Sequence, residues 1–262
     1  MLRIRAVAEQ SSLTRIAILF IAILTAVPAW AASDQYQGST LIDRYREALA
    51  RQQDALRDVS MEVHMEGRIP KLKKEGKLSA LRKISSLGKV TYKAVSFWGD
   101  DTVKKEVMAR YMTAEVEAAS QEVEAASQEK VEPKENIAIT PENYEFKYKG
   151  LNDRNNMRVH VFELKPRRKR VGLFKGELWL DPDTCLPVRE AGRLVKNPSV
   201  FIKKMEFARY YEIKDGVAYL RRMETKTETR IVGRAELNIE YANFHKPADA
   251  VAEAPVAELR SQ

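Results

Sequence analysis

Residues 217–244 read VAYLRRMETKTETRIVGRAELNIEYANF, and the second half of this stretch shows the alternation on which the fold depends. Apolar and mostly polar side chains alternate there one by one, which is the period of a β-strand with one buried face. The apolar positions are Ile231, Ala235, Leu237, Ile239 and Tyr241. Because Asp215-Gly216 before the stretch is a turn signal, residues 217–227 and 231–244 are predicted to be two strands of an antiparallel meander.

The same alternation recurs through most of the chain. Further strands are predicted at 59–69, 77–84, 90–98, 144–148, 157–164, 176–181, 186–195 and 201–213. Other turn signals are Asn152-Asp153, Asp181-Pro182-Asp183 and Asn197-Pro198. A sheet of about ten such strands must curl to bury its apolar face. The predicted fold class is mainly β (α+β): a strongly curved antiparallel sheet that forms an incomplete barrel, covered by one or two amphipathic helices.

Two segments have the helical period instead. Apolar residues between Leu41 and Leu56 recur at helical spacing, and Thr40 with Asp43 approximates a capping box at the start of that helix. A second helix is predicted after Asp100 or Asp101, either of which can cap it. Its apolar face consists of Val103, Val107, Met108 and Tyr111. These helices are expected to cover the open side of the sheet.

A heptad is duplicated after the second helix. Residues 115–121 and 122–128 both read EVEAASQ. One interpretation is a two-heptad coiled coil with Val116 and Val123 in one seam, although a coiled coil is normally inferred from three or four heptads. The other is a copied segment at a solvent-facing helix end or loop, where insertions are tolerated. We expect a variable helical or loop insertion near 113–140.

The N-terminus has the layout of a secretory signal peptide. Three arginines within the first fifteen residues precede the uncharged run IAILFIAILTAV at 16–27. Ala29-Trp30-Ala31 then supplies a small-x-small cleavage site, so residues 1–31 are predicted to be removed after about Ala31. The alternative is an uncleaved transmembrane anchor, but the run is shorter than the ~20 residues that a bilayer span needs.

The mature chain is predicted to be periplasmic and basic. Cleavage leaves one domain at 32–245 and a tail at 246–262 that is predicted to be disordered, because it lacks apolar periodicity. The formal charge falls from +8 to +6, since residues 1–31 contain three arginines and one glutamate. Anionic lipid headgroups, envelope polymers or acidic proteins are therefore expected partners, whereas nucleic acid is not. The only cysteine, Cys185, is far from the cleavage site and can form neither a lipobox nor an internal disulfide.

The sequence contains no recognisable catalytic or metal-binding pattern. His64, His160 and His245 lack partners at ligand or general-base spacing, and we interpret them as surface or rim residues. Asp181 and Asp183 invite a calcium interpretation, but the glycine and glutamate of a calcium loop are missing, so a β-turn is favoured. Neither a phosphate-binding loop nor a nucleophile elbow is present. No enzyme activity, cofactor or metal is predicted, and an envelope hydrolase is only a third alternative.

One loop is dense in cations. Lys165, Arg167, Arg168, Lys169 and Arg170 lie within six residues. As a connection between strands they form either an ordinary solvated loop or an electrostatic contact with a membrane or an acidic partner. No aromatic residue interrupts them, so a stacking surface for single-stranded nucleic acid is not indicated.

Several aromatic side chains are expected on the concave side of the sheet. A curved sheet closed by only two helices often leaves an apolar cavity, and such a cavity without catalytic groups favours the carriage of a lipid. The candidates for the lipid cavity are Phe97, Trp98, Phe146, Tyr148, Phe162, Trp179, Phe207 and Tyr219.

These features together resemble a known family. Residues 175–189 read KGELWLDPDTCLPVR, a strand then ends in YEIKDG at 211–216, and RRM follows at 221–223. This pattern is similar to the second half of the outer-membrane lipoprotein-sorting proteins, the LolA-like superfamily. Ala218-Tyr219-Leu220 departs from it, because relatives often carry a proline after the Asp-Gly turn.

The resemblance implies an incomplete β-barrel whose apolar cavity takes up lipid or lipoprotein acyl chains in the periplasm, without catalysis. It also implies an inner-membrane donor, an outer-membrane acceptor and a monomeric carrier. The same fold serves periplasmic sensors that regulate a membrane partner, so a sensor or interaction protein is the alternative function.

Overall fold

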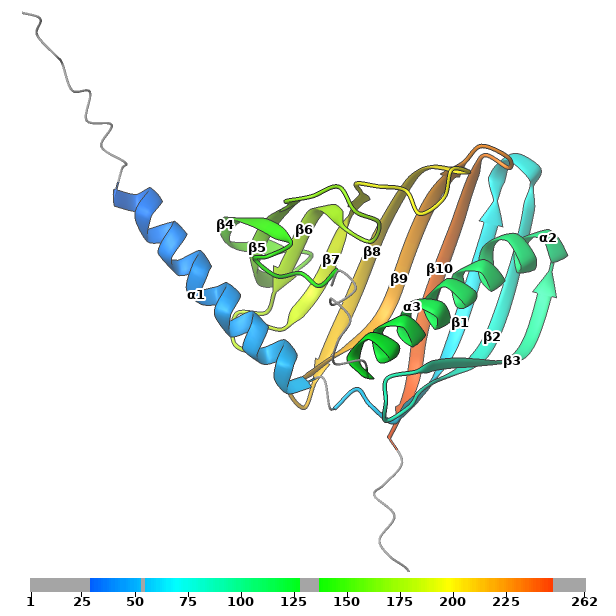
Figure 1. Cartoon of the computed structure of the whole chain (residues 1–262), viewed down its shortest axis with the longest axis horizontal. Helices are drawn as coiled ribbons and strands as arrows, with labels where there is room; N and C mark the ends of the chain where they lie inside the picture. Colours follow the sequence, from blue (N-terminus) through cyan, green and yellow to red (C-terminus); the bar gives the residue numbers. More distant parts are fainter. Residues whose placement is uncertain (1–28, 53–54, 128–136, 247–262) are drawn as a thin grey trace, which may run out of the picture.

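The computed structural model describes residues 29–52, 55–127 and 137–246 (Figure 1). Most of the predicted signal peptide therefore lies outside the described residues, and residues 29–31 begin helix α1 (Ala29–Gln52). The predicted tail lies outside them beyond Lys246. Among the helices that are described, none has the length and hydropathy of a membrane-spanning segment.

Ten antiparallel strands form one curved sheet, which confirms the predicted fold class. The strands are β1 (Val59–Ile69), β2 (Lys74–Ile84), β3 (Val90–Gly99), β4 (Tyr144–Arg154), β5 (Met157–Pro166), β6 (Phe174–Leu180), β7 (Pro187–Leu194), β8 (Ile202–Lys214), β9 (Val217–Thr229) and β10 (Arg234–His245). Their order across the sheet is β3-β2-β1-β10-β9-β8-β7-β6-β5-β4. Strands β3 and β4 are the two edges and do not pair with each other, so the barrel stays open.

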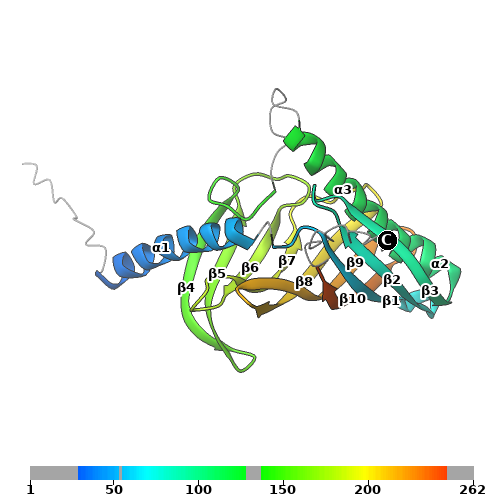
Figure 2. The same cartoon turned by 90° about the horizontal axis from the view of Figure 1, so that it is seen from below.

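The curvature has a local cause in the strand pairing. The register shifts at several points, including Ser79/Ala80, Tyr148/Leu151 and Tyr210/Tyr211. An extra residue on one strand bends that strand and increases its twist. The accumulated bends give the sheet the concave side seen in Figure 2.

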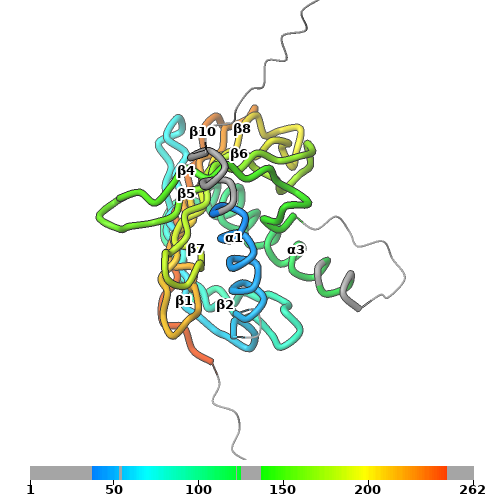
Figure 3. The backbone as a smooth tube through the Cα atoms, turned by 90° about the vertical axis from the view of Figure 1, so that its left-hand side faces the viewer, coloured from blue at the N-terminus to red at the C-terminus, as the bar shows by residue number. Residues whose placement is uncertain are grey.

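Both helical segments lie on this concave side (Figures 2 and 3). The second consists of α2 (Asp101–Val103), a π-helical turn (Lys104–Ala109) and α3 (Arg110–Ser127). Asp100 caps it as predicted, because its carboxylate accepts a hydrogen bond from the Thr102 amide at 2.7 Å. Gly67 allows close approach to the sheet, since a Cβ atom there would lie 2.7 Å from the Val103 side chain.

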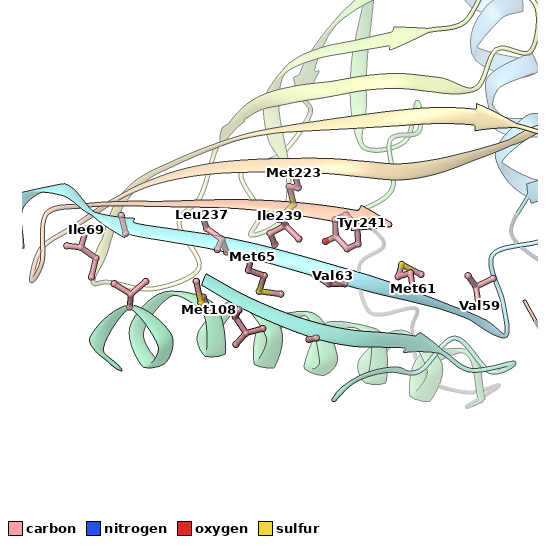
Figure 4. Close-up of a cluster of buried hydrophobic side chains, with 14 residues drawn as sticks. Val59, Met61, Val63, Met65, Ile69, Met108, Met223, Leu237, Ile239 and Tyr241 are labelled. Atoms are coloured by element: carbon pink, nitrogen blue, oxygen red, sulfur yellow. The ribbon is translucent and has the colours of Figure 1, made fainter. Parts of the chain in front are cut away.

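The two largest apolar clusters of the described residues lie one under each helix. The α3 core, shown in Figure 4, contains the buried residues Val59, Met61, Val63, Met65, Ile69, Leu78, Ala80, Val103, Met108, Met223, Ala235, Leu237, Ile239 and Tyr241. The α1 core contains Leu41, Tyr45, Ile139, Tyr144, Phe162, Leu164, Leu173, Phe174, Leu178, Leu180 and Cys185. Each helix therefore covers its own part of the sheet.

Two local predictions are wrong. Helix α1 begins at Ala29, so Thr40 lies inside the helix and is not its N-cap. The turn between β4 and β5 is formed by Asn155 and Asn156, with φ angles of 51° and 61°, and not by Asn152-Asp153. Two central residues with positive φ are characteristic of a tight hairpin turn, and asparagine tolerates this conformation.

The duplicated heptad continues helix α3. Both copies are helical up to Ser127, and Gln128 lies outside the described residues. In the first copy Glu115 contacts the sheet, whereas Glu117 is exposed. The first copy therefore belongs to the covering helix, and the dispensability of the second copy stays a prediction.

Candidate functional site

The concave face changes character between the two cores. In the register of the sheet, Leu178 lies opposite Glu190, which lies opposite Arg209 on the next strand. Arg209 in turn lies opposite Met223. Since Leu178 belongs to the α1 core and Met223 to the α3 core, two charged side chains interrupt an otherwise apolar row. We call this region, which comprises Glu190, Phe207, Arg209, Tyr211 and Thr225, the central strip.

Arg209 is a cation within this apolar surrounding. Its Nη1 atom lies 3.2 Å from Glu190 Oε2, and the Glu190 side chain is only 8% exposed, whereas that of Arg209 is 43% exposed. Burial opposes the charge of Arg209, but Tyr211 and Glu190 hold its pKa above the ordinary arginine value. Arg209 therefore presents a permanent positive charge to accessible space on the concave face.

Tyrosine hydroxyls surround this ion pair. Burial, reinforced by the Glu190 charge, raises the pKa of Tyr211 and that of Tyr45 well above the ordinary tyrosine value. Burial also raises the pKa of Tyr144, whose hydroxyl accepts a hydrogen bond from the Phe174 amide at 3.3 Å. These hydroxyls therefore remain protonated at neutral pH.

Aromatic rings adjoin the cation. Phe207 is half-buried, and its ring packs edge-on against Phe174 with centroids 4.9 Å apart. The Arg209 guanidinium lies 5.1 Å from the Phe207 ring centroid. Phe174 can lie close to the backbone because residue 192 is glycine, where a Cβ atom would be 2.6 Å from the Phe174 ring. The central strip therefore combines an aromatic surface with the accessible cation of Arg209, which is paired with the nearly buried Glu190.

The structure brings four of the eight predicted cavity residues together. Phe146, Tyr148, Phe162 and Phe207 all belong to the α1 core or pack against it. Phe146 and Tyr148 lie 6.0 Å and 5.1 Å from Phe162, measured between ring centroids. Their contact with a lipid remains a prediction.

The other four candidates lie elsewhere. Phe97 packs against the α3 core, and Trp98 is 63% exposed. Trp179 forms a separate cluster with Val159, Val161 and Val188, because neighbouring residues on β6 point to opposite faces of the sheet. The Tyr219 ring packs against that of Phe244 at a tilt of 53°, with centroids 4.8 Å apart.

Glu190 and Arg209 were not among the site residues predicted from the sequence. A signal for Arg209 was present, because Phe207, Arg209 and Tyr211 alternate along one strand. The pairing with Glu190 depends on the register of β7 and β8 and could not be read from local sequence.

Helix α3 is fastened to the sheet by polar groups. Glu115 accepts hydrogen bonds from Arg82 Nη2 and Nε at 2.6 Å and 3.1 Å, and from the Tyr92 hydroxyl. The Tyr111 and Tyr241 hydroxyls lie 3.1 Å apart. Burial, followed by the charge of Glu115, raises the pKa of Tyr241 to about 12. This arrangement holds α3 over the α3 core.

The prediction that the histidines lie at the surface or rim is wrong for His160. It is 7% exposed, and its Nδ1 atom lies 2.7 Å from the Tyr148 hydroxyl. Burial, followed by the charge of Arg44, lowers its pKa. His64 and His245 are exposed, as predicted.

Asp181 has the structural role predicted for it. One carboxylate oxygen accepts hydrogen bonds from the Asp183 amide and from the Thr184 amide and hydroxyl, at 2.8–3.1 Å. Cys185, which follows, is buried, and burial raises the pKa of its thiol. In the described part of the chain, no three His, Cys, Asp or Glu side chains are grouped as metal ligands would be.

A hollow lies at the rim of the sheet, outside the central strip. It has a volume of about 460 Å³ between the second half of α1 and the β6–β7 and β8–β9 turns. Its lining is Arg44, Glu47, Ala48, Arg51, Gln52, Asp183, Thr184, Leu186, Asp215, Gly216 and Val217. This mixture of charges is unsuited to an acyl chain.

The predicted basic loop connects β5 and β6, and several of its cations have protein partners. Lys165 pairs with Glu145 at 3.1 Å, and Arg167 Nε donates to the Pro141 carbonyl at 2.7 Å. Arg170 Nη2 donates to Asn143 Oδ1 at 2.9 Å. Arg168 and Lys169 are exposed. The contact of this loop with a membrane or partner remains a prediction.

No known protein-family profile matches the chain, and no curated protein does so. Among solved structures, the chain is similar to a DUF1329 family protein from Desulfovibrio piger, with 13% identity, coverage of 81% of this chain and 94% of that one, and a TM-score of 0.40. It is similar to an outer membrane lipoprotein-sorting protein domain from Vibrio parahaemolyticus, with 12% identity, coverage of 79% and 92%, and a TM-score of 0.40. For a LolA superfamily protein from Nitrosomonas europaea, the identity is 9%, the coverage is 80% and 94%, and the TM-score is 0.37. The superfamily that the sequence resembles is thus represented among the structures to which the chain is similar.

Proposed function

We propose that the protein is a periplasmic, non-catalytic carrier that holds a lipid, or the acyl chains of a lipoprotein, against the concave face of its sheet. The central strip is the observation that carries this proposal. There, half-buried Phe207 and Tyr211 flank the accessible cation of Arg209 on a face that is otherwise filled by two apolar cores.

The strip offers an amphiphile two kinds of contact. An acyl chain lying beside Phe207 would be removed from water, and each buried methylene group contributes ~0.8 kcal/mol. A phosphate or carboxylate would lie near the accessible guanidinium of Arg209, where charge-assisted hydrogen bonds are strong. In this proposal the protein acts as a monomer that receives its cargo from an inner-membrane donor and passes it to an outer-membrane acceptor.

The test measures what the purified mature protein carries. We expect organic extraction and mass spectrometry to recover phospholipid or acylated peptide from the wild type, and much less from Phe207→Glu. The matched control is Val95→Glu, which alters a 72% exposed residue on edge strand β3. Thermal unfolding of both variants separates a loss of cargo from a loss of fold. Wild-type protein without bound lipid, or Phe207→Glu with undiminished lipid, would refute the carrier.

One observation favours the alternative, a sensor or interaction protein that regulates a membrane partner. Edge strand β3 carries Val95 and Trp98, whose side chains are 72% and 63% exposed. A free strand edge with exposed apolar side chains is suited to contact with another protein. This function predicts that extraction yields no lipid. It also predicts that a stable partner co-purifies with the wild type and with Phe207→Glu, but not with Val95→Glu.

A further inference from the structure

Four loops at one end of the sheet share an unusual composition. They are the β1–β2 turn at 70–73 (PKLK), the β5–β6 loop at 167–173 (RRKRVGL), the β7–β8 loop at 195–201 (VKNPSVF) and the β9–β10 turn at 230–233 (RIVG). Each contains at least one lysine or arginine, and none contains aspartate or glutamate. We call these four loops the basic end.

The loops of the basic end adjoin one another along the sheet, whose upper margin in Figure 1 shows several of them. The amide and Nε of Arg230 donate to the carbonyl oxygens of Phe201 and Val200, both at 2.9 Å. The Val195 amide donates to the Leu173 carbonyl at 3.0 Å. These bonds link three of the loops, and the fourth adjoins them because the Lys71 side chain lies 3.4 Å from the position of a Cβ atom on Gly233.

Every loop of the basic end also exposes an apolar side chain. The exposed residues are Leu72 (41%), Val171 (45%), Val200 (79%), Phe201 (53%) and Ile231 (72%). These exposed apolar side chains remain in contact with water unless a membrane or another molecule covers them. A bilayer with anionic lipids offers phosphates to the cations and a hydrocarbon region to the apolar tips.

At the opposite end of the sheet only the β2–β3 turn, with Lys89 and the exposed Leu87, resembles these loops, and other turns there are acidic. The β6–β7 and β8–β9 turns contain Asp181, Asp183 and Asp215. Near the basic end, Asp100 pairs with Lys74 at 3.2 Å and Glu142 with Arg46 at 4.0 Å. The charge is therefore distributed unevenly between the two ends.

We infer that the basic end docks the protein on the surface of an anionic bilayer, with Val200, Phe201 and Ile231 entering the headgroup region. This extends the basic-loop prediction from one loop to a four-loop surface, and it does not depend on what the concave face holds. Docking is reversible, because each cation contributes roughly a fivefold gain in binding and salt screens it over a Debye length of ~8 Å.

The experiment measures sedimentation of the mature protein with vesicles of phosphatidylglycerol and phosphatidylcholine, and with vesicles of phosphatidylcholine alone. The charge variant replaces the exposed Lys71, Arg168, Lys169 and Lys196 with serine, and leaves Arg167 and Arg170 with their partners. The apolar variant is Val200→Ser/Ile231→Ser. The control, Leu87→Ser/Lys89→Ser, alters a 68% exposed leucine and an exposed lysine in the β2–β3 turn at the opposite end.

Wild type should bind the anionic vesicles preferentially, and the charge variant should lose at least about tenfold in affinity at low salt and most of the salt dependence. The apolar variant should lose affinity at every salt concentration, while the control binds like the wild type. Docking on a bilayer is refuted if wild type does not distinguish the vesicles, or if the control loses as much as the other variants. It is also refuted if the charge variant still binds anionic vesicles like the wild type but no longer co-purifies with an acidic protein partner. Extraction of the same variants should recover undiminished lipid, so failure of docking is distinguishable from failure of the carrier function.

Discussion

Replacement of Glu115 by alanine should destabilise the fold more than any other single change on the surface of α3. The carboxylate joins α3 to Arg82 and Tyr92 of the sheet. The Arg82 side chain is 12% exposed and that of Glu115 is 24% exposed. Removal of Glu115 therefore leaves a buried guanidinium without its counter-charge.

The magnitude follows from this burial. Removing one partner of a buried ion pair lowers the free energy of unfolding by about 3–5 kcal/mol. Because Glu115 is partly exposed and Arg82 also contacts the Met61 sulfur at 3.6 Å, we expect about 2–3 kcal/mol. For a domain of this size, 1 kcal/mol corresponds to roughly 2–4 °C, so Glu115→Ala should lower the melting temperature by roughly 5–10 °C.

Thermal and urea unfolding of the mature protein measure the effect. The matched control is Glu117→Ala, an exposed glutamate two residues further along α3. Arg82→Met/Glu115→Ala should regain at least half of the lost stability, since the unpaired charge is then gone. Equal melting temperatures for the Glu115 and Glu117 variants, or a double variant less stable than Glu115→Ala, would contradict the reasoning.

Three further outcomes are expected. Deletion of residues 122–128 should change the free energy of unfolding by no more than ~0.5 kcal/mol, and a loss of several kcal/mol in urea unfolding would show that the second heptad is packed. Gly192→Ala should lower the free energy of unfolding by about 1–3 kcal/mol, because the new Cβ atom would lie 2.5 Å from the Lys175 carbonyl and 2.6 Å from the Phe174 ring. An unchanged urea midpoint would mean that β6 and β7 move apart there without cost. His160 has a lowered pKa in the folded state, so the unfolded chain binds its proton first and stability falls as the pH drops below about 6.5. His160→Gln should make that fall shallower, and identical pH profiles of the melting temperature would exclude this contribution.

The strands could be predicted because the alternation of apolar and polar residues is visible in the local sequence. All ten strands lie near the predicted ranges. The pairing of β1 with β10 could not be predicted, since nothing in the local sequence of residues 59–69 or 234–245 indicates that these strands are neighbours. The β4–β5 turn was predicted at Asn152-Asp153, but these residues pair with Val159 and Arg158 of β5, so β4 continues to Arg154. In both cases the deciding contact lies on another strand.

The candidate site was predictable only in part, for a related reason. In the run Glu177-Leu178-Trp179-Leu180 both faces of the strand carry apolar residues, so composition could not show that Trp179 points away from the α1 core. Glu190 and Arg209 resembled ordinary surface charges. They become a site only when two strands bring them together between the apolar cores.

The pairing of the first strand with the last also governs when the protein can fold. Strands β1 and β10 pair within the sheet although most of the domain separates them in sequence, and contacts of such long sequence separation slow folding. While the chain is being synthesised, the hairpins of β1–β3 have no strand to complete them until β10 emerges. For the periplasmic function proposed above, this delay is useful, because the sheet is not completed until β10 has been made.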